Sequence, residues 1–193
     1  MPGMSAPRLP EMRVWLTVAV AAAEVAHLAW ERSNGGIVSH HLLNRADLPA
    51  ISNAWGLLVL PALTWFLSGL ALKRVSGRSG ENGTGSGLLP GVVAGFAVAL
   101  LLGLLLSVCF THGYETAVSS LFLGMFMLAL LLRVYRAECL LGFVLGMTFT
   151  FGAVLPTLIG SIVVAVSALV HLGIRPVFVR LLNRSKRQPS PGA

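Results

Sequence analysis

The segment Leu88 to Phe110, LLPGVVAGFAVALLLGLLLSVCF, contains no charged side chain in 23 residues. As an α-helix it would be about 34 Å long at 1.5 Å per residue, and the hydrocarbon core of a bilayer is about 30 Å thick. A helix also satisfies its own backbone hydrogen bonds, which hydrocarbon requires of any spanning segment. The segment therefore predicts a transmembrane helix.

The composition of the whole chain agrees with this prediction. Of 193 residues, 55% are hydrophobic and only 11% are charged, and the mean hydropathy is +0.81. A soluble fold needs about a quarter of its residues charged, so a soluble enzyme is excluded. The net charge of +7 does not indicate nucleic-acid binding, because the basic residues lie at the ends of apolar segments and form no basic face.

The same length criterion identifies the other spans. Together with 88–110 it gives four plain spans, and the apolar region 139–174 is too long for one crossing and carries Gly152, Pro156 and Gly160 at its middle. A proline can end one helix and begin another, so we predict a break near Leu155 and Pro156. The sequence thus predicts an all-α, polytopic transmembrane bundle of six spans, at 14–30, 51–72, 88–110, 117–132, 139–155 and 157–174.

The lysines and arginines orient these spans. Twelve of the 14 lie on the side of the N-terminus, the second and fourth connections and the tail, and two, Arg32 and Arg45, lie on the other side. Basic connections face the cytoplasm, so both termini are predicted to be cytoplasmic, in an inner (plasma) membrane of bacterial type. Residues 73–87 are predicted to be a flexible cytoplasmic linker, and residues 176–193 a basic cytoplasmic tail.

An alternative for the first span is a cleaved leader. Arg8 and Arg13 precede it, and Ala21 to Ala23 offers a small-residue cleavage site. The outward connections are the same in either case.

The histidines are unevenly distributed between the two faces. Four of the five map to the outer side, together with four of the seven acidic residues: His27, His40, His41, His112, Glu24, Glu31, Asp47 and Glu115. Ionisable groups in or beside a span are costly in hydrocarbon, so each is a functional candidate.

Glu24, His27 and Glu31 are spaced by three and four residues, which stacks them on one helix face. A Glu-x-x-His pair can offer a carboxylate and an imidazole to one metal ion when other helices supply further ligands. We therefore predict an outward-facing metal pocket for zinc or iron, with haem as a less favoured cofactor. Its predicted ligands are His27, His112, one of His40 or His41, and Glu24; Glu24 and Glu115 are the candidate catalytic carboxylates, and Glu31 and Asn53 would orient the ligands.

Such a pocket predicts metal-assisted hydrolysis of a lipid-like substrate that enters from the bilayer. In the first outer connection, Ile37, Val38, Leu42 and Leu43 alternate with polar residues and favour a short helix on the outer leaflet, which would cover the pocket. Asp47 is predicted to cap the second span.

Two non-enzymatic alternatives remain open. One is a transporter or a metal or haem carrier that uses the same polar face. The other is a membrane assembly subunit, because Gly91, Gly95, Ala99 and Gly103 form a stripe of small residues that would allow close packing, either within the monomer or with a second copy or membrane partner.

Ser119, Ser120 and His171 resemble the serine and histidine dyad of the rhomboid family of six-span proteases. That resemblance implies a serine hydrolase. The chain departs from the family pattern, because Ala117-Val118-Ser119-Ser120 replaces GxSG and the HxxxN motif of the second helix is missing.

Overall fold

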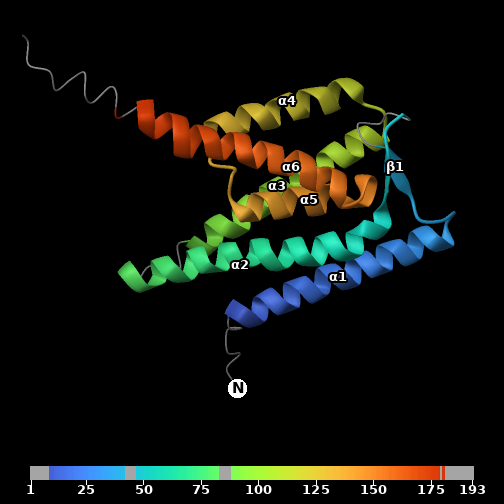
Figure 1. Cartoon of the computed structure of the whole chain (residues 1–193), viewed down its shortest axis with the longest axis horizontal. Helices are drawn as coiled ribbons and strands as arrows, with labels where there is room; N and C mark the ends of the chain where they lie inside the picture. Colours follow the sequence, from blue (N-terminus) through green and yellow to red (C-terminus); the bar gives the residue numbers. More distant parts are fainter. Residues whose placement is uncertain (1–8, 42–46, 83–87, 179, 181–193) are drawn as a thin grey trace, which may run out of the picture.

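The computed structural model describes residues 9–41, 47–82, 88–178 and 180. Within them the fold is all-α, and six α-helices run alternately up and down a single bundle (Figure 1). Their bounds are α1 Leu9–Ser33, α2 Gly56–Asn82, α3 Leu88–Thr111, α4 Glu115–Leu131, α5 Ala137–Phe151 and α6 Val154–Ala168. A π-helical turn, η4, Leu169–Ile174, continues α6.

Four of these helices are long and apolar enough to cross a membrane. They are Pro10–Ser33, Asn53–Ser76, Leu89–Thr111 and Val154–Phe178. The remaining two, α4 and α5, have 17 and 15 residues, which corresponds to about 26 and 22 Å. The all-α class is thus confirmed, with four long apolar helices and two shorter ones.

The surface of the bundle is apolar. Phe66 is 67% exposed, Leu101 64% and Leu131 73%, and a large exposed apolar surface marks an interaction or membrane face. Trp30, Trp55 and Tyr114 are also exposed, and all three lie at the same end of the bundle, as the aromatic residues of a membrane interface do. This surface fits an integral membrane protein.

The closest helix pair is α3 and α5, which lie between the α1–α2 pair and the helices α4 and α6 (Figure 1). A Cβ atom added at Gly103 would lie 2.6 Å from the carbonyl oxygen of Phe143, and one at Gly146 would meet the carbonyl oxygen of Leu100. Gly142 is equally close to the backbone of α3. Small residues allow helix backbones in a membrane to approach in this way.

The small-residue stripe of α3 is therefore partly used inside the monomer. Gly103 faces the backbone of α5, and Gly95 faces Glu138 and Cys139 of the same helix, whereas a Cβ at Gly91 would meet nothing. Packing within the monomer accounts for Gly95 and Gly103.

The break between α5 and α6 lies earlier than predicted. Helix α5 ends at Phe151, Gly152 has φ +67°, and α6 begins at Val154. A positive φ suits glycine, whereas Pro156 is accommodated in the first turn of α6, where its missing N–H is not needed. The prediction of a break at Leu155 and Pro156 is wrong by a few residues.

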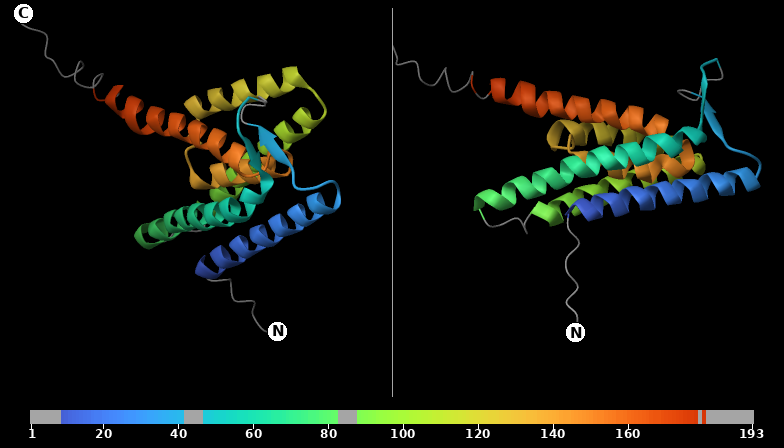
Figure 2. Two further views of the ribbon diagram at one scale, coloured as in Figure 1. Left: turned by 45° about the vertical axis from the view of Figure 1, so that its right-hand side comes forward. Right: turned by 60° about the horizontal axis from the view of Figure 1, so that its bottom comes forward.

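The connection between α1 and α2 contains a β-hairpin instead of the predicted surface helix. Strand β1, Ser39–His41, pairs antiparallel with β2, Ala50–Ser52, with His40 opposite Ile51. Figure 2 shows the hairpin projecting at the end of the bundle. The alternation of apolar and polar residues there has the period of a strand. Residues 42–46, including Leu42 and Leu43, lie outside the described residues.

The entry to α2 also differs from the prediction. A 3₁₀ turn, η2, Asn53–Trp55, precedes the helix, and the Ser52 hydroxyl accepts a hydrogen bond from the Ala54 N–H. Ser52 therefore caps this turn, and the predicted cap Asp47 lies before the strand β2. At the other end, residues 73–82 of the predicted linker continue α2, and residues 83–87 lie outside the described residues. So do residues 181–193 of the predicted tail.

We expect Gly146→Ala to destabilise the protein by about 1–3 kcal/mol, because the added methyl overlaps the backbone of α3. Thermal unfolding in detergent measures the effect. Gly124→Ala on α4 is the matched control: its Cβ meets nothing within 4 Å, so stability should stay unchanged or rise by up to about 1 kcal/mol. Equal stability of the two variants would contradict the packing described for α3 and α5.

Candidate functional site: a buried carboxylate and imidazole network

Glu24, His27 and Glu31 lie on one face of α1, as their spacing predicts. Glu24 is 3% exposed and Glu31 5%. The Nδ1 atom of His27 lies 3.5 Å from Oε2 of Glu24, and its Nε2 atom lies 3.5 Å from Oε1 of Glu31. Each nitrogen of one buried imidazole thus faces a buried carboxylate.

Glu31 joins this network to the hairpin connection. Its Oε1 accepts a hydrogen bond of 2.6 Å from the side-chain amide of Asn53, and its Oε2 accepts one of 3.1 Å from the backbone N–H of Val38. The Oδ1 atom of the same amide fills the space where Gly152 lacks a Cβ. The Glu31 carboxylate therefore ties the end of α1 to the residue before β1 and to the turn before α2, and Asn53 packs in turn against Gly152 between α5 and α6.

Glu24 lies deeper in the bundle. Its Oε1 atom is buried without a hydrogen-bond partner among the described residues, and it occupies the space over Gly56, where an added Cβ would lie 1.8 Å away. The ring of Phe149 lies 5.0 Å from that of His27 and 5.7 Å from that of Trp30. These rings separate the polar groups from the apolar surroundings.

The hairpin covers a small apolar cavity at the same end of the bundle. The cavity has a volume of about 210 Å³ and lies between the ends of α3, α4, α5 and α6. Its lining is His40, His41, Leu106, Phe110, Val118, Phe122, Met147, Phe151, Leu155, Pro156 and Ile159. The two histidines of β1 are the polar part of this lining.

Burial lowers the pKa of His40, and the carboxylate of Glu31 opposes this effect to a lesser extent. The ring lies 6.3 Å from that of Phe151, and its Nε2 has no hydrogen-bond partner in the described part of the chain. His41 differs, because its Nδ1 lies 2.7 Å from the carbonyl oxygen of Leu48. His40 is therefore held neutral against the cavity.

The predicted metal pocket of His27, His112, one of His40 or His41, and Glu24 is not assembled among the described residues. His112 is exposed in the turn between α3 and α4 and stacks on Tyr114 at 6.0 Å, and Glu115 lies in the first turn of α4, where a carboxylate favours the helix dipole. Within residues 9–41, 47–82 and 88–178, no group of three or more His, Cys, Asp or Glu side chains is arranged to hold a metal ion. The sequence indicated that these residues lie at the same depth in the membrane. Residues at the same depth can still lie on different sides of the bundle, and their side chains then do not meet.

The rhomboid-like dyad is also not formed. Ser119 and Ser120 are exposed in the first turns of α4. His171 lies in η4 near the opposite end of the bundle, where its ring lies 6.1 Å from that of Tyr135, beyond the end of α4. Its Nδ1 lies 3.0 Å from the carbonyl oxygen of Ser167.

Two features at the opposite end were missed by the sequence analysis. The first is a buried ion pair: the guanidinium of Arg74 donates to Oε1 of Glu138 at 2.5 Å, and Glu138 is 3% exposed. A carboxylate at the start of an apolar run was the available signal, but its partner comes from a helix 64 residues away.

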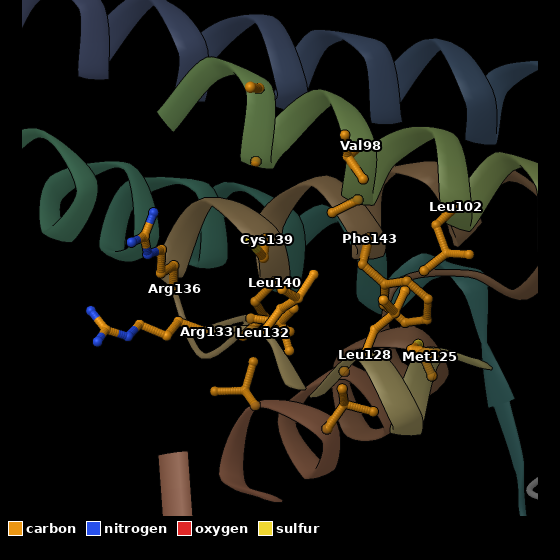
Figure 3. A pocket seen from close by; sticks show the side chains of 17 residues that line it. Val98, Leu102, Met125, Leu128, Leu132, Arg133, Arg136, Cys139, Leu140 and Phe143 are labelled. Atoms are coloured by element: carbon orange, nitrogen blue, oxygen red, sulfur yellow. The ribbon is translucent and has the colours of Figure 1, made fainter. Parts of the chain in front are cut away.

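The second is an apolar cavity of about 510 Å³ between α3, α4, α5 and α6 (Figure 3). It is lined by Ala94, Gly95, Val98, Ala99, Leu102, Met125, Leu128, Leu132, Arg133, Val134, Arg136, Cys139, Leu140, Phe143, Gly160, Val163 and Val164. No single segment carries this set, so no local pattern could indicate it.

Neither a protein-family model, nor a curated protein, nor a solved structure matches this chain. The function is therefore argued from the geometry of the sites.

We expect the closed hairpin to lose stability as the pH falls below about 6.5, the ordinary pKa of histidine. The lowered pKa of His40 means that the opened hairpin binds a proton more readily than the closed one, so acid favours opening. Hydrogen exchange of the backbone amides around β1, corrected for the intrinsic pH dependence, measures it. In His40→Gln the acid-induced increase in exchange should disappear; its persistence would assign the effect to another group.

Proposed function

We propose that this chain is a plasma-membrane protein of six crossings with both termini in the cytoplasm. The support is the alternating direction of the helices together with the position of the basic residues. Arg13, Arg74, Arg133, Arg136 and Arg175 all lie toward the end of the bundle opposite the hairpin. Basic residues mark the cytoplasmic side, so the hairpin and the Glu24–His27–Glu31 network face outward.

Within this architecture, the network is proposed to bind and release a proton and thereby to hold the hairpin over the outer cavity. The observation that carries this proposal is that both nitrogens of His27 face buried carboxylates at 3.5 Å, while Glu31 also accepts the two hydrogen bonds that fasten the hairpin connection. Glu31 therefore belongs to the proposed proton-binding network and also holds the hairpin connection.

The charge balance of the network explains the coupling. A buried group of ions is least costly when its net charge is zero. With both carboxylates ionised and the imidazole neutral the three groups carry a charge of −2, so two bound protons give that balance. The two carboxylates differ in their hydrogen bonds: two N–H groups donate to Glu31, whereas no described donor reaches Oε1 of Glu24.

Loss of a proton from this arrangement leaves uncompensated negative charge next to Glu31. The repulsion weakens the hold on Val38 and Asn53, and the hairpin moves away from the cavity. The proposal favours a proton-responsive, ligand-binding or transport protein over the metal-dependent hydrolase. A metal-dependent hydrolase would need about three protein ligands around one ion, and no such group of His, Cys, Asp or Glu side chains is found among the described residues.

The orientation is tested by reporter fusions. A reporter active only in the cytoplasm should work after Gly85 or Arg187, and one active only outside should work after Gly36. A cytoplasmic signal from the Gly36 fusion would reverse the outward assignment of the network.

The coupling is tested by thiol labelling of the outer cavity. With Cys109 and Cys139 replaced by serine, Leu155→Cys places a thiol in the cavity lining, and Ile37→Cys in a separate variant places one on exposed chain. We expect labelling of residue 155 by a membrane-impermeant reagent, relative to residue 37, to rise several-fold as the pH is raised above neutrality.

Glu24→Gln removes one of the two carboxylates, so it should flatten this rise. Glu115→Gln, which removes an exposed carboxylate at the same end of the bundle, is the matched control and should leave the rise intact. If the labelling ratio rises equally in Glu24→Gln, the network does not control the hairpin.

A further inference from the structure

The larger cavity lies at the cytoplasmic end of α3, α4, α5 and α6, away from the proton-binding network, and its two ends differ in chemistry. Leu102, Met125 and Phe143 close one end, and Arg133 and Arg136 stand together at the other (Figure 3). Its volume of about 510 Å³ falls within the roughly 300–1,000 Å³ of small-molecule sites. An apolar cavity with cations at its mouth has the polarity of an amphiphile binding site.

The two arginines carry charge that no described residue neutralises. Neither has an ion-pair partner among the residues that the structure describes, and the nearby carboxylate of Glu138 is paired with Arg74. The mouth therefore keeps two positive charges. It also lies beside the first turn of α5, whose N-cap residue, Arg136, makes no side-chain capping bond, and the positive end of the helix dipole favours an anion there.

The cavity is open toward the bilayer. Val98 lines it and is 67% exposed, and Leu128 and Leu132 line it and are 43% and 55% exposed. These residues belong to the apolar surface that meets lipid in a membrane. A lipid chain can therefore enter sideways without crossing a polar region.

We propose that this cavity binds an anionic phospholipid of the cytoplasmic leaflet, with one acyl chain between α3 and α6 and the phosphate at Arg133 and Arg136. The apolar part of the cavity accommodates the acyl chain. The positive charge at its mouth selects an anionic headgroup. Arginine forms strong, paired hydrogen bonds with phosphate oxygens. The C-terminal segment 181–193 is not a suitable occupant, because it carries Arg184, Lys186 and Arg187 and no acidic residue.

The inference shares the membrane orientation of the proposed function but not its proton-binding network. Failure of lipid binding would leave the reporter and labelling results untouched, and failure of the labelling test would leave lipid binding untouched.

Native mass spectrometry of the full-length protein in detergent tests the proposal. The probes are phosphatidylglycerol and phosphatidylcholine with identical acyl chains. We expect phosphatidylglycerol to bind about tenfold more tightly, and the double variant Arg133→Gln/Arg136→Gln to remove that preference, since each charge-assisted hydrogen bond is worth about tenfold or more. The variant Arg175→Gln/Arg180→Gln removes two exposed charges from the same end of the bundle and should keep the preference.

A second variant tests the position of the acyl chain. Ala94 is exposed and lines the cavity, so Ala94→Trp should block it and lower the affinity for both lipids. Three results would overturn the proposal: equal binding of the two lipids by the unmodified protein, displacement of phosphatidylglycerol by inorganic phosphate, or a dimer that Ala94→Trp dissociates. The second would indicate a simple anion site, and the third a second copy of the chain as the occupant.

Discussion

The backbone contact between α3 and α5 is the constraint on which the rest of the structure depends. Gly142 and Gly146 place their Cα atoms against the backbone of α3, and Gly103 returns the contact from α3. In lipid the hydrophobic effect does not drive helices to associate, so close packing of this kind is a principal source of the affinity between them. Because the contact lies in the middle of both helices, it fixes the position of the α3, α4, α5 and α6 ends. Both cavities lie at those ends, one on each side of the contact.

Buried charge is handled differently at the two ends of the bundle. At the end of the bundle away from the hairpin, one arginine meets one carboxylate, and the two opposite charges balance each other. At the hairpin end, two carboxylates meet one imidazole, so the charges of the three groups do not balance without bound protons. An ion pair missing a partner is strongly destabilising in a low-dielectric interior. The Arg74–Glu138 pair is balanced by its own two charges, whereas the Glu24–His27–Glu31 network is not, and we therefore propose the switching role for the network and not for the pair.

The sequence predicted the features of the fold that depend only on position along the chain or along one helix. Helix class and approximate spans follow from apolar length, and the stacking of Glu24, His27 and Glu31 follows from helical periodicity. Arrangement around the bundle axis does not follow from either. His27 and His112 were assigned to one site because they lie at similar depth, yet His27 is buried beside Phe149 and His112 is exposed beside Tyr114. The hairpin was missed because four alternating residues suit a strand as well as an amphipathic turn, and Gly152 competes with Pro156 as the point of reversal. Resolving these cases required tertiary contacts.

The two cavities are separated by a single cluster of side chains. Leu106 and Met147 line the outer cavity, Met125 and Phe143 line the inner one, and all four belong to one buried cluster. A ligand in either cavity therefore packs against the same group of residues. Methionine is the most adaptable of the apolar side chains, since it has three rotatable bonds and no branch. A core that contains two methionines between two apolar cavities can adjust its shape without moving the glycine contact, because that contact is made by backbone atoms. The glycine contact therefore holds α3 and α5 in place, while the side chains between the two cavities can rearrange.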